Sequence, residues 1–118
     1  MNGSFAAGDI VLADWRDALP KEPNKLRPAI VVEDDGLFDA DYPNLLLVLL
    51  AEDAKLGAPD LSVRIEPSPL NGCTKPCFAL AAHVATTSKQ RIRRTQSRVT
   101  AAELAAIRDR IAIALGLA

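Results

Sequence analysis

The apolar residues of this chain occur in short runs, and no other feature of the sequence constrains the fold as much. The longest runs, residues 45–51 and 111–118, hold no more than eight residues, whereas a helix that crosses a bilayer needs about 20. The sequence therefore excludes a membrane-spanning helix. With 118 residues the chain can bury roughly 65% of its unfolded surface, which is enough for a core without disulfide or metal support. We expect one domain over residues 1–118.

Six runs have the composition of β-strands, because they are rich in β-branched residues or leucine and are bounded by Gly, Pro or Asp. They span residues 9–13, 29–33, 45–50, 61–65, 78–84 and 92–99. The intervening segments contain prolines and many acidic residues, which predicts surface loops. These segments are residues 15–26, 34–44 and 52–60. Short strands joined by such loops are typical of a small barrel, so the pattern predicts a mainly β fold.

The clearest element of the sequence is a helix at its end. The segment Thr100-Ala101-Ala102-Glu103 fits a capping box, in which the Thr hydroxyl and the Glu carboxylate each accept a backbone N–H at the helix start. Val99 and Leu104 are spaced for a hydrophobic staple across this start. Apolar residues then recur on one face, and Gly116 is placed as the stop signal. The residues of that face are Leu104, Ile107, Ile111 and Leu115.

The charges of the chain are distributed unevenly although they nearly cancel, to a net charge of −1. Residues 1–85 carry 7 basic and 13 acidic side chains, and residues 86–118 carry 7 basic and 2 acidic side chains. Five basic residues fall within ten positions that contain no acid, namely Lys89, Arg91, Arg93, Arg94 and Arg98. This density suits a polyanion, an acidic protein surface or acids of the first part of the chain, and it is equally typical of a solvated strand face.

Several familiar enzyme motifs do not occur in the sequence. It has no phosphate-binding glycine-rich loop, nucleophile elbow, zinc-protease motif or dinucleotide fingerprint. Cys73 and Cys77, together with His83, offer three soft metal ligands, whereas a structural zinc site needs four. We therefore expect no metal and no cofactor, with Cys77 as a small buried strand residue and Cys73 in a turn, both reduced.

Two residues have types and positions that suit phosphoryl chemistry. Arg27 directly precedes Pro28 at the entry to a predicted strand, where its guanidinium is placed to bind phosphate or to pair with a loop acid. His83 is the only histidine, and it lies at the predicted end of a strand. An imidazole there can transfer protons near neutral pH or can serve as a hydrogen-bonded structural group.

Taken together, four segments resemble the MazF/PemK/Kid family of toxins. They are Gly8-Asp9-Ile10-Val11, the segment Lys25-Leu26-Arg27-Pro28-Ala29-Ile30-Val31-Val32, a strand after Cys77, and the closing Thr-x-x-Glu helix. The resemblance spans roughly residues 7–117. It implies an SH3-like small β-barrel of the plasmid maintenance toxin type with a C-terminal α-helix. It also implies a homodimeric, growth-inhibiting toxin of a type II toxin–antitoxin system, an endoribonuclease that cleaves single-stranded mRNA at specific sequences without a metal.

In that chemistry the ribose 2′-hydroxyl attacks the adjacent phosphorus, so the site needs a base, an acid and a cation for the developing charge. Arg27 matches the loop arginine of the family. The family's Thr or Ser after the third strand is replaced by Ala51 or Glu52, and its Asp-Gln-x-Arg block reads Ala82-His83-Val84-Ala85 here. Loss of the second arginine costs about 100-fold to 1,000-fold in rate unless another cation replaces it.

These matches lead to one set of expected site residues. Arg27 clamps the phosphate and stabilises the oxyanion, and His83 acts as general acid or base. Thr86, Thr87, Lys89 and Arg91 contact phosphates, with Lys89 or Arg91 replacing the missing cation. Trp15 stacks on a base of the RNA or instead anchors its own loop on the core.

Two further functions remain open beside the ribonuclease. One is a relative that keeps the fold and dimer but binds RNA or a protein target, as the related gyrase poison CcdB does, and the other is an inactive paralogue that only titrates an antitoxin. The expected partners are a second copy of the chain, a cognate antitoxin and single-stranded RNA, with no membrane. Because no basic residue precedes Arg16, the start lacks the features of a signal peptide, and we expect a cytoplasmic protein.

Overall fold

The computed structural model describes residues 5–14, 26–53 and 58–117. In this part of the chain six strands form one antiparallel sheet, and one α-helix follows the last strand. The strands are β1 (Asp9–Asp14), β2 (Leu26–Val31), β3 (Asn44–Ala51), β4 (Ser62–Ile65), β5 (Cys77–Ser88) and β6 (Ile92–Arg98), and the helix is α1 (Ala101–Ala114). Two 3-10 turns, η2 (Pro59–Leu61) and η3 (Lys89–Arg91), precede β4 and β6. The predicted mainly β fold with a C-terminal helix is confirmed.

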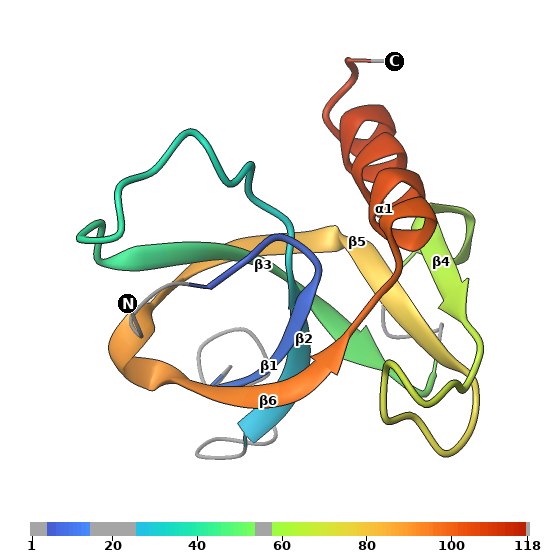
Figure 1. Ribbon diagram of the computed structural model, residues 1–118. Coiled ribbons are helices and arrows are strands. Elements are labelled where there is room, and N and C mark those ends of the chain that lie inside the picture. Colours follow the sequence, from blue (N-terminus) through green and yellow to red (C-terminus); the bar gives the residue numbers. More distant parts are fainter. Residues whose placement is uncertain (1–4, 15–25, 54–57, 118) are drawn as a thin grey trace.

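The strands follow the order β4-β5-β3-β2-β1-β6 across the sheet, so that β4 and β6 are its edges. The sheet curls strongly, and the long β5 leads through η3 directly into β6 on the opposite side of the curl (Figure 1). The strands thereby surround a common interior as in a barrel. The helix α1 stands outside the curl and packs against β4 and β5 (Figure 1).

The sheet separates two apolar layers, because successive side chains of a strand point to opposite faces. The inner layer lies within the curl and contains Val11, Ala13, Ala29, Val31, Leu45, Leu47, Leu49 and Leu80. The outer layer lies under α1 and contains Ile10, Ile30, Val32, Val48, Leu50, Ile65, Ala79, Val99 and Ile107. Both faces of β3 are therefore covered, which explains why its sequence is a continuous apolar run without polar alternation.

The helix begins as the sequence predicts. The Glu103 backbone N–H donates to the Thr100 hydroxyl (3.1 Å), and the Thr100 backbone N–H donates to the Glu103 carboxylate (2.8 Å). Ile107 is fully buried, but Leu115 is 61% exposed. Leu115 is the last member of the predicted apolar series, but it lies past the end of α1 at Ala114, where the last turn of the helix projects beyond the sheet (Figure 1). Within the described residues, no helix is long and apolar enough to cross a membrane.

The fifth strand differs most from its predicted extent. It continues to Ser88 rather than ending at residue 84, because the whole length of β3 pairs with it, from Asn44 opposite Ser88 to Ala51 opposite Phe78. The register slips in the middle: Val48 pairs with Val84, whereas Leu49 pairs with Leu80. Residues 81–83 therefore form a bulge. Such a bulge bends a strand and re-aims its side chains, which fits the sharp turn of β5 in Figure 1.

Candidate functional site

Arg27 lies in a pocket beside the C-terminal end of β3, at one end of the central strands. It is the second residue of β2 and pairs with Ala13 of β1, so it is part of a strand rather than the root of a loop. Ala29 of β2 pairs with Leu49 of β3, which brings the start of β2 beside the end of β3. The pocket has a volume of about 390 Å³. Its walls are Arg27, Pro28, Leu50, Ala51, Glu52, Asp53 and Cys77.

Among the described residues, the charged groups of this pocket are one guanidinium and two carboxylates. The Nε atom of Arg27 is shut off from solvent, and Arg27 and Asp53 both interact within the chain. Glu52 pairs at 3.2 Å with Lys75, but both side chains are about 60% exposed, so this ion pair adds little stability. A guanidinium held in this way is preorganised, and its planar fork fits the oxygen atoms of a phosphate.

Cys77 contributes a thiol to the same pocket. Burial, a hydrogen bond with the Cys73 side chain and the charge of Glu52 raise the pKa of Cys77 from 9.0 to about 11. At neutral pH the group is therefore a protonated thiol, which is neither a good nucleophile nor a metal ligand. Both cysteines are free. The described residues contain no group of three or more His, Cys, Asp or Glu side chains arranged to hold a metal ion.

His83 does not line this pocket. It lies on the bulge of β5, beside the step from Val48 to Leu49 in β3, and its side chain is partly exposed. The sequence predicts His83 at the end of a strand, but the residue lies in the interior of β5. There the bulge sets the direction of its imidazole. Its role in proton transfer stays a prediction.

The other expected phosphate contacts lie at the opposite end of β3. Thr86 and Thr87 pair with Leu46 and Leu45, whereas Arg27 lies near Ala51. Leu45 and Ala51 are six positions apart along the strand, a distance of about 20 Å. The structure therefore brings these threonines close to Lys89 but not to Arg27 within one copy of the chain. Arg91 lies in η3 and interacts within the chain, and Trp15 lies outside the described residues.

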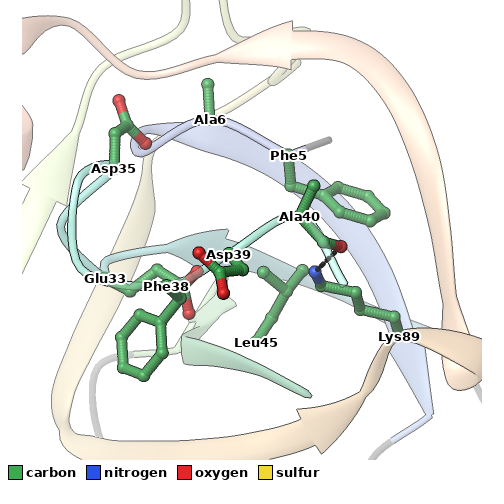
Figure 2. A pocket seen from close by; sticks show the side chains of 9 residues that line it. All are labelled: Phe5, Ala6, Glu33, Asp35, Phe38, Asp39, Ala40, Leu45 and Lys89. Atoms are coloured by element: carbon green, nitrogen blue, oxygen red, sulfur yellow. Dashed lines mark hydrogen bonds between the residues drawn. The ribbon is translucent and has the colours of Figure 1, made fainter. Parts of the chain in front are cut away.

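Lys89 is part of a second pocket, of about 310 Å³, which the sequence did not predict (Figure 2). The Lys89 ammonium donates to the Ala40 carbonyl at 3.1 Å. Glu33 and Asp35 accept backbone N–H groups of Leu46 (3.0 Å) and Ala7 (2.7 Å). The walls are Phe5, Ala6, Glu33, Asp35, Phe38, Asp39, Ala40, Leu45 and Lys89. Three carboxylates against one ammonium, counted over the residues that the structure describes, make this pocket unsuited to phosphate.

The sequence reasoning missed Asp53 and Cys77 as neighbours of Arg27. Cys77 was assigned only a structural role, and Asp53 was assigned to a loop. Both reach the pocket because β3 pairs with β2 on one side and β5 on the other. A signal for Glu52 and Asp53 was present, since polar residues directly after a buried strand lie at the edge of a sheet.

Comparisons with protein families and with solved structures both point to one family of toxins. Residues 6–115 match the family described as PemK-like, MazF-like toxin of type II toxin-antitoxin system. No curated protein matches the chain. A MazF structure from Deinococcus radiodurans is similar, with a TM-score of 0.73 and 23% identity over 95% of this chain and 96% of that chain.

Two structures of toxins with antitoxins also resemble the chain. A mycobacterial endoribonuclease in complex with its cognate antitoxin has a TM-score of 0.70 and 19% identity, over 100% of this chain and 98% of that chain. A MazE-MazF complex from Deinococcus radiodurans has a TM-score of 0.71 and 21% identity, over 98% and 99%. At these identities the likeness concerns the fold.

Proposed function

The chain belongs to the PemK-like, MazF-like family of toxins of type II toxin–antitoxin systems, and on this basis we propose that it is an endoribonuclease toxin. It cleaves single-stranded RNA without a metal ion and is neutralised by a cognate antitoxin. The similar mycobacterial endoribonuclease is held in complex with its antitoxin, which supports the choice of partner. The observation that carries the proposal is the placement of Arg27 in a pocket beside two carboxylates.

The pocket supplies the groups that such a cleavage needs. When the 2′-hydroxyl attacks, negative charge develops on the phosphate oxygens that do not take part in bond making. Arg27 is held by β2 at the pocket wall, so its guanidinium binds these oxygens without first being ordered. The reaction leaves a 2′,3′-cyclic phosphate on one fragment and a 5′-hydroxyl on the other.

Two groups compete for the proton transfers. Glu52 lines the pocket with Arg27, whereas His83 lies on the β5 bulge. A base within hydrogen-bond reach of the 2′-hydroxyl favours the pocket residue. We therefore assign the base to Glu52 and keep His83 as the group to test against it, by comparing Glu52→Gln with His83→Ala. A greater loss of cleavage in His83→Ala than in Glu52→Gln contradicts this assignment.

The function is tested by incubating the purified chain with single-stranded RNA of mixed sequence in EDTA. We expect cyclic phosphate ends by mass analysis, and a roughly 100-fold to 1,000-fold slower reaction for Arg27→Ala. The matched control is Arg110→Ala, which removes the same charge from an exposed position of α1 and leaves the rate unchanged. Thermal unfolding of each variant shows that the fold is retained.

Intact RNA with the wild-type chain contradicts the ribonuclease. That result would favour one of the two other functions, a relative that binds its target without cleaving it or a paralogue that titrates an antitoxin. The sequence has Ala51 and Ala85 at the positions that match a hydroxyl residue and an arginine in the family resemblance. These two alanines favour the relative that binds without cleaving. Binding of RNA that weakens steeply with salt distinguishes a nucleic-acid target from a protein target.

A further inference from the structure

Two cysteines lie at the two ends of a short turn beside the Arg27 pocket. Cys77 is the first residue of β5 and a wall of the pocket. Cys73 precedes it by four positions, and the chain bends at Thr74 and Lys75 between them. Both cysteine side chains are partly buried and pack against the outer layer of the sheet. The turn therefore holds two thiols on the same side of the sheet, next to the proposed site.

The sulfur atoms of these cysteines are within reach of each other. The Cys77 thiol forms a hydrogen bond with the Cys73 side chain. Its sulfur also lies 3.5 Å from the Lys75 carbonyl oxygen, and the Cys73 sulfur lies 3.9 Å from the Asn71 carbonyl oxygen. The chain has only these two cysteines, so each thiol can exchange only with the other or with a second molecule.

The backbone is fixed at both ends of the turn. The Cys73 backbone N–H donates to the side-chain oxygen of Asn71 at 2.9 Å, and Asn71 is buried. Cys77 pairs with Ile65 of β4. Residues 74–75, between these ends, are exposed. The movement that brings the sulfurs to the bond length of about 2.05 Å therefore falls on the exposed part of the turn and leaves the sheet intact.

We propose that Cys73 and Cys77 form a disulfide with a low-molecular-mass disulfide such as oxidised glutathione as the oxidant, and that this bond weakens RNA binding at the Arg27 pocket. First the Cys73 thiolate attacks one sulfur of the oxidant, forming a mixed disulfide and releasing one glutathione thiolate. The Cys77 thiolate then attacks the Cys73 sulfur and releases the second glutathione. The two cysteines lose two protons and two electrons, and the oxidant takes them up as two thiols.

The surroundings of Cys77 set the order of these two steps. Its pKa, raised to about 11, makes its thiolate scarce at neutral pH, so the first attack falls to Cys73. The second step waits until the Cys77 thiol loses its proton. We therefore expect the rate of ring closure from the mixed disulfide to rise about tenfold per pH unit from about pH 7 to about pH 10.

The effect on RNA arises through Lys75, in the middle of the turn. Its ammonium lies 3.2 Å from the Glu52 carboxylate, which lines the pocket with Arg27 and Asp53. Joining the sulfurs closes a ring around Lys75 and changes the backbone direction there, so the ammonium moves away from Glu52. The carboxylate then acts on the pocket without its ammonium partner, and a phosphate binds less tightly. This effect rests on the proposed ribonuclease function, whereas the disulfide itself does not.

The disulfide is tested on the reduced, purified chain by incubation with oxidised glutathione, followed by N-ethylmaleimide under denaturing conditions. Intact-mass spectrometry is expected to show a monomer that has lost two hydrogen atoms and carries no maleimide. Cys77→Ser is expected to stop with one glutathione on Cys73, whereas Cys73→Ser acquires glutathione about tenfold or more slowly. A wild-type chain that keeps both thiols, stops at the mixed disulfide or forms only a disulfide-linked dimer overturns the proposal.

Binding of a mixed-sequence RNA with 2′-O-methyl groups, which cannot be cleaved by 2′-hydroxyl attack, tests the effect on the pocket. We expect the oxidised chain to bind about threefold or more weakly than the reduced chain, and reduction with dithiothreitol to restore binding. Lys75→Met is expected to bind as weakly before oxidation and to lose nothing further on it. The matched control is the double variant Cys73→Ser/Cys77→Ser, whose affinity stays constant through the same oxidation and reduction.

The outcomes separate this proposal from the function on which its second part rests. Equal RNA binding by the oxidised and reduced wild-type chain overturns the link between the disulfide and the pocket, and it leaves the ribonuclease intact. A reduced chain that neither binds nor cleaves RNA overturns both the ribonuclease and that link. The mass measurement decides the disulfide in either case, because it does not depend on RNA.

Discussion

At the scale of single residues, the role proposed for Arg27 depends on its fixed position in a strand. The pairing of β2 with β1 fixes its backbone opposite Ala13, and its buried Nε atom restricts the side chain. We expect Arg27→Lys to keep the charge but lose the two-pronged contact to phosphate, so that kcat falls by roughly tenfold to 100-fold. Single-turnover cleavage of a labelled RNA measures this, with Arg110→Lys as control. Full activity of Arg27→Lys would show that only charge at this position matters.

Cys77 gives the pocket a second property that can be measured, the ionisation of its thiol. Because burial and the Cys73 hydrogen bond raise its pKa to about 11, the reactive thiolate is scarce at neutral pH. We expect its alkylation rate to rise about tenfold per pH unit without a plateau until near pH 11. An unperturbed thiol levels off near 9.0. Mass spectrometry that resolves Cys77 from Cys73 checks the profile, and a plateau near pH 9 contradicts the burial of the thiol.

At the scale of elements, the segment between β4 and β5 approaches β6 closely at Gly72. Gly72 has a φ of 69°, and a Cβ atom there would meet the Ser97 hydroxyl at 2.7 Å. We expect Gly72→Ala to lower the free energy of unfolding by roughly 1–3 kcal/mol, through left-handed strain and the clash together. Urea unfolding measures this loss.

A second substitution separates the two causes of that loss. Ser97→Ala in the Gly72→Ala background removes the clashing hydroxyl and leaves the strain of the backbone, so we expect part of the stability to return. Gly36→Ala is the control, because φ there is not left-handed and the nearest atom is the Asp34 carboxylate at 3.3 Å. It should change stability by less than about 0.5 kcal/mol. No recovery in the double variant would assign the whole loss to the backbone.

Elements with a local cause could be predicted from the sequence, and those with a distant cause could not. The start of α1 was predictable because Thr100 and Glu103 satisfy each other's backbone groups within four residues. The six strands were predictable because apolar runs and loop residues alternate along the chain. The length of β5 and its bulge were not, since the pairing with β3 sets them. Periodicity places Leu115 in line with Leu104, Ile107 and Ile111, but it does not show that the end of the helix extends beyond the sheet.

At the scale of the whole molecule, the curl of the sheet decides which residues share a site. The family resemblance in the sequence groups Arg27 with Thr86, Thr87 and Lys89 in one site. The pairing of β3 with β5 places the latter three about 20 Å from the Arg27 end of β3. The same pairing brings Cys77 to Arg27 although 50 positions separate them in the chain. Contacts of this kind depend on strand register, which no local pattern in the sequence specifies.

This separation leads to a prediction that opposes the role expected for Lys89. Its ammonium donates to the Ala40 carbonyl among three carboxylates, so its charge serves the fold rather than a phosphate. We expect Lys89→Ala to cost at most about 1 kcal/mol of stability and to leave RNA cleavage within threefold of the wild-type rate. Cleavage kinetics and urea unfolding of the same preparation check both values.

A large loss of cleavage in Lys89→Ala would require the two ends of β3 to act in one site, which one copy of the chain does not allow at about 20 Å. The site would then combine Arg27 of one protomer with Lys89 of its partner. Mixing Arg27→Ala with Lys89→Ala protomers decides this, because a mixed dimer would contain one site with both residues intact and would regain activity that neither variant has alone. Since Lys89 already has a partner in its own protomer, we expect the mixture to show only the activity of its Lys89→Ala component.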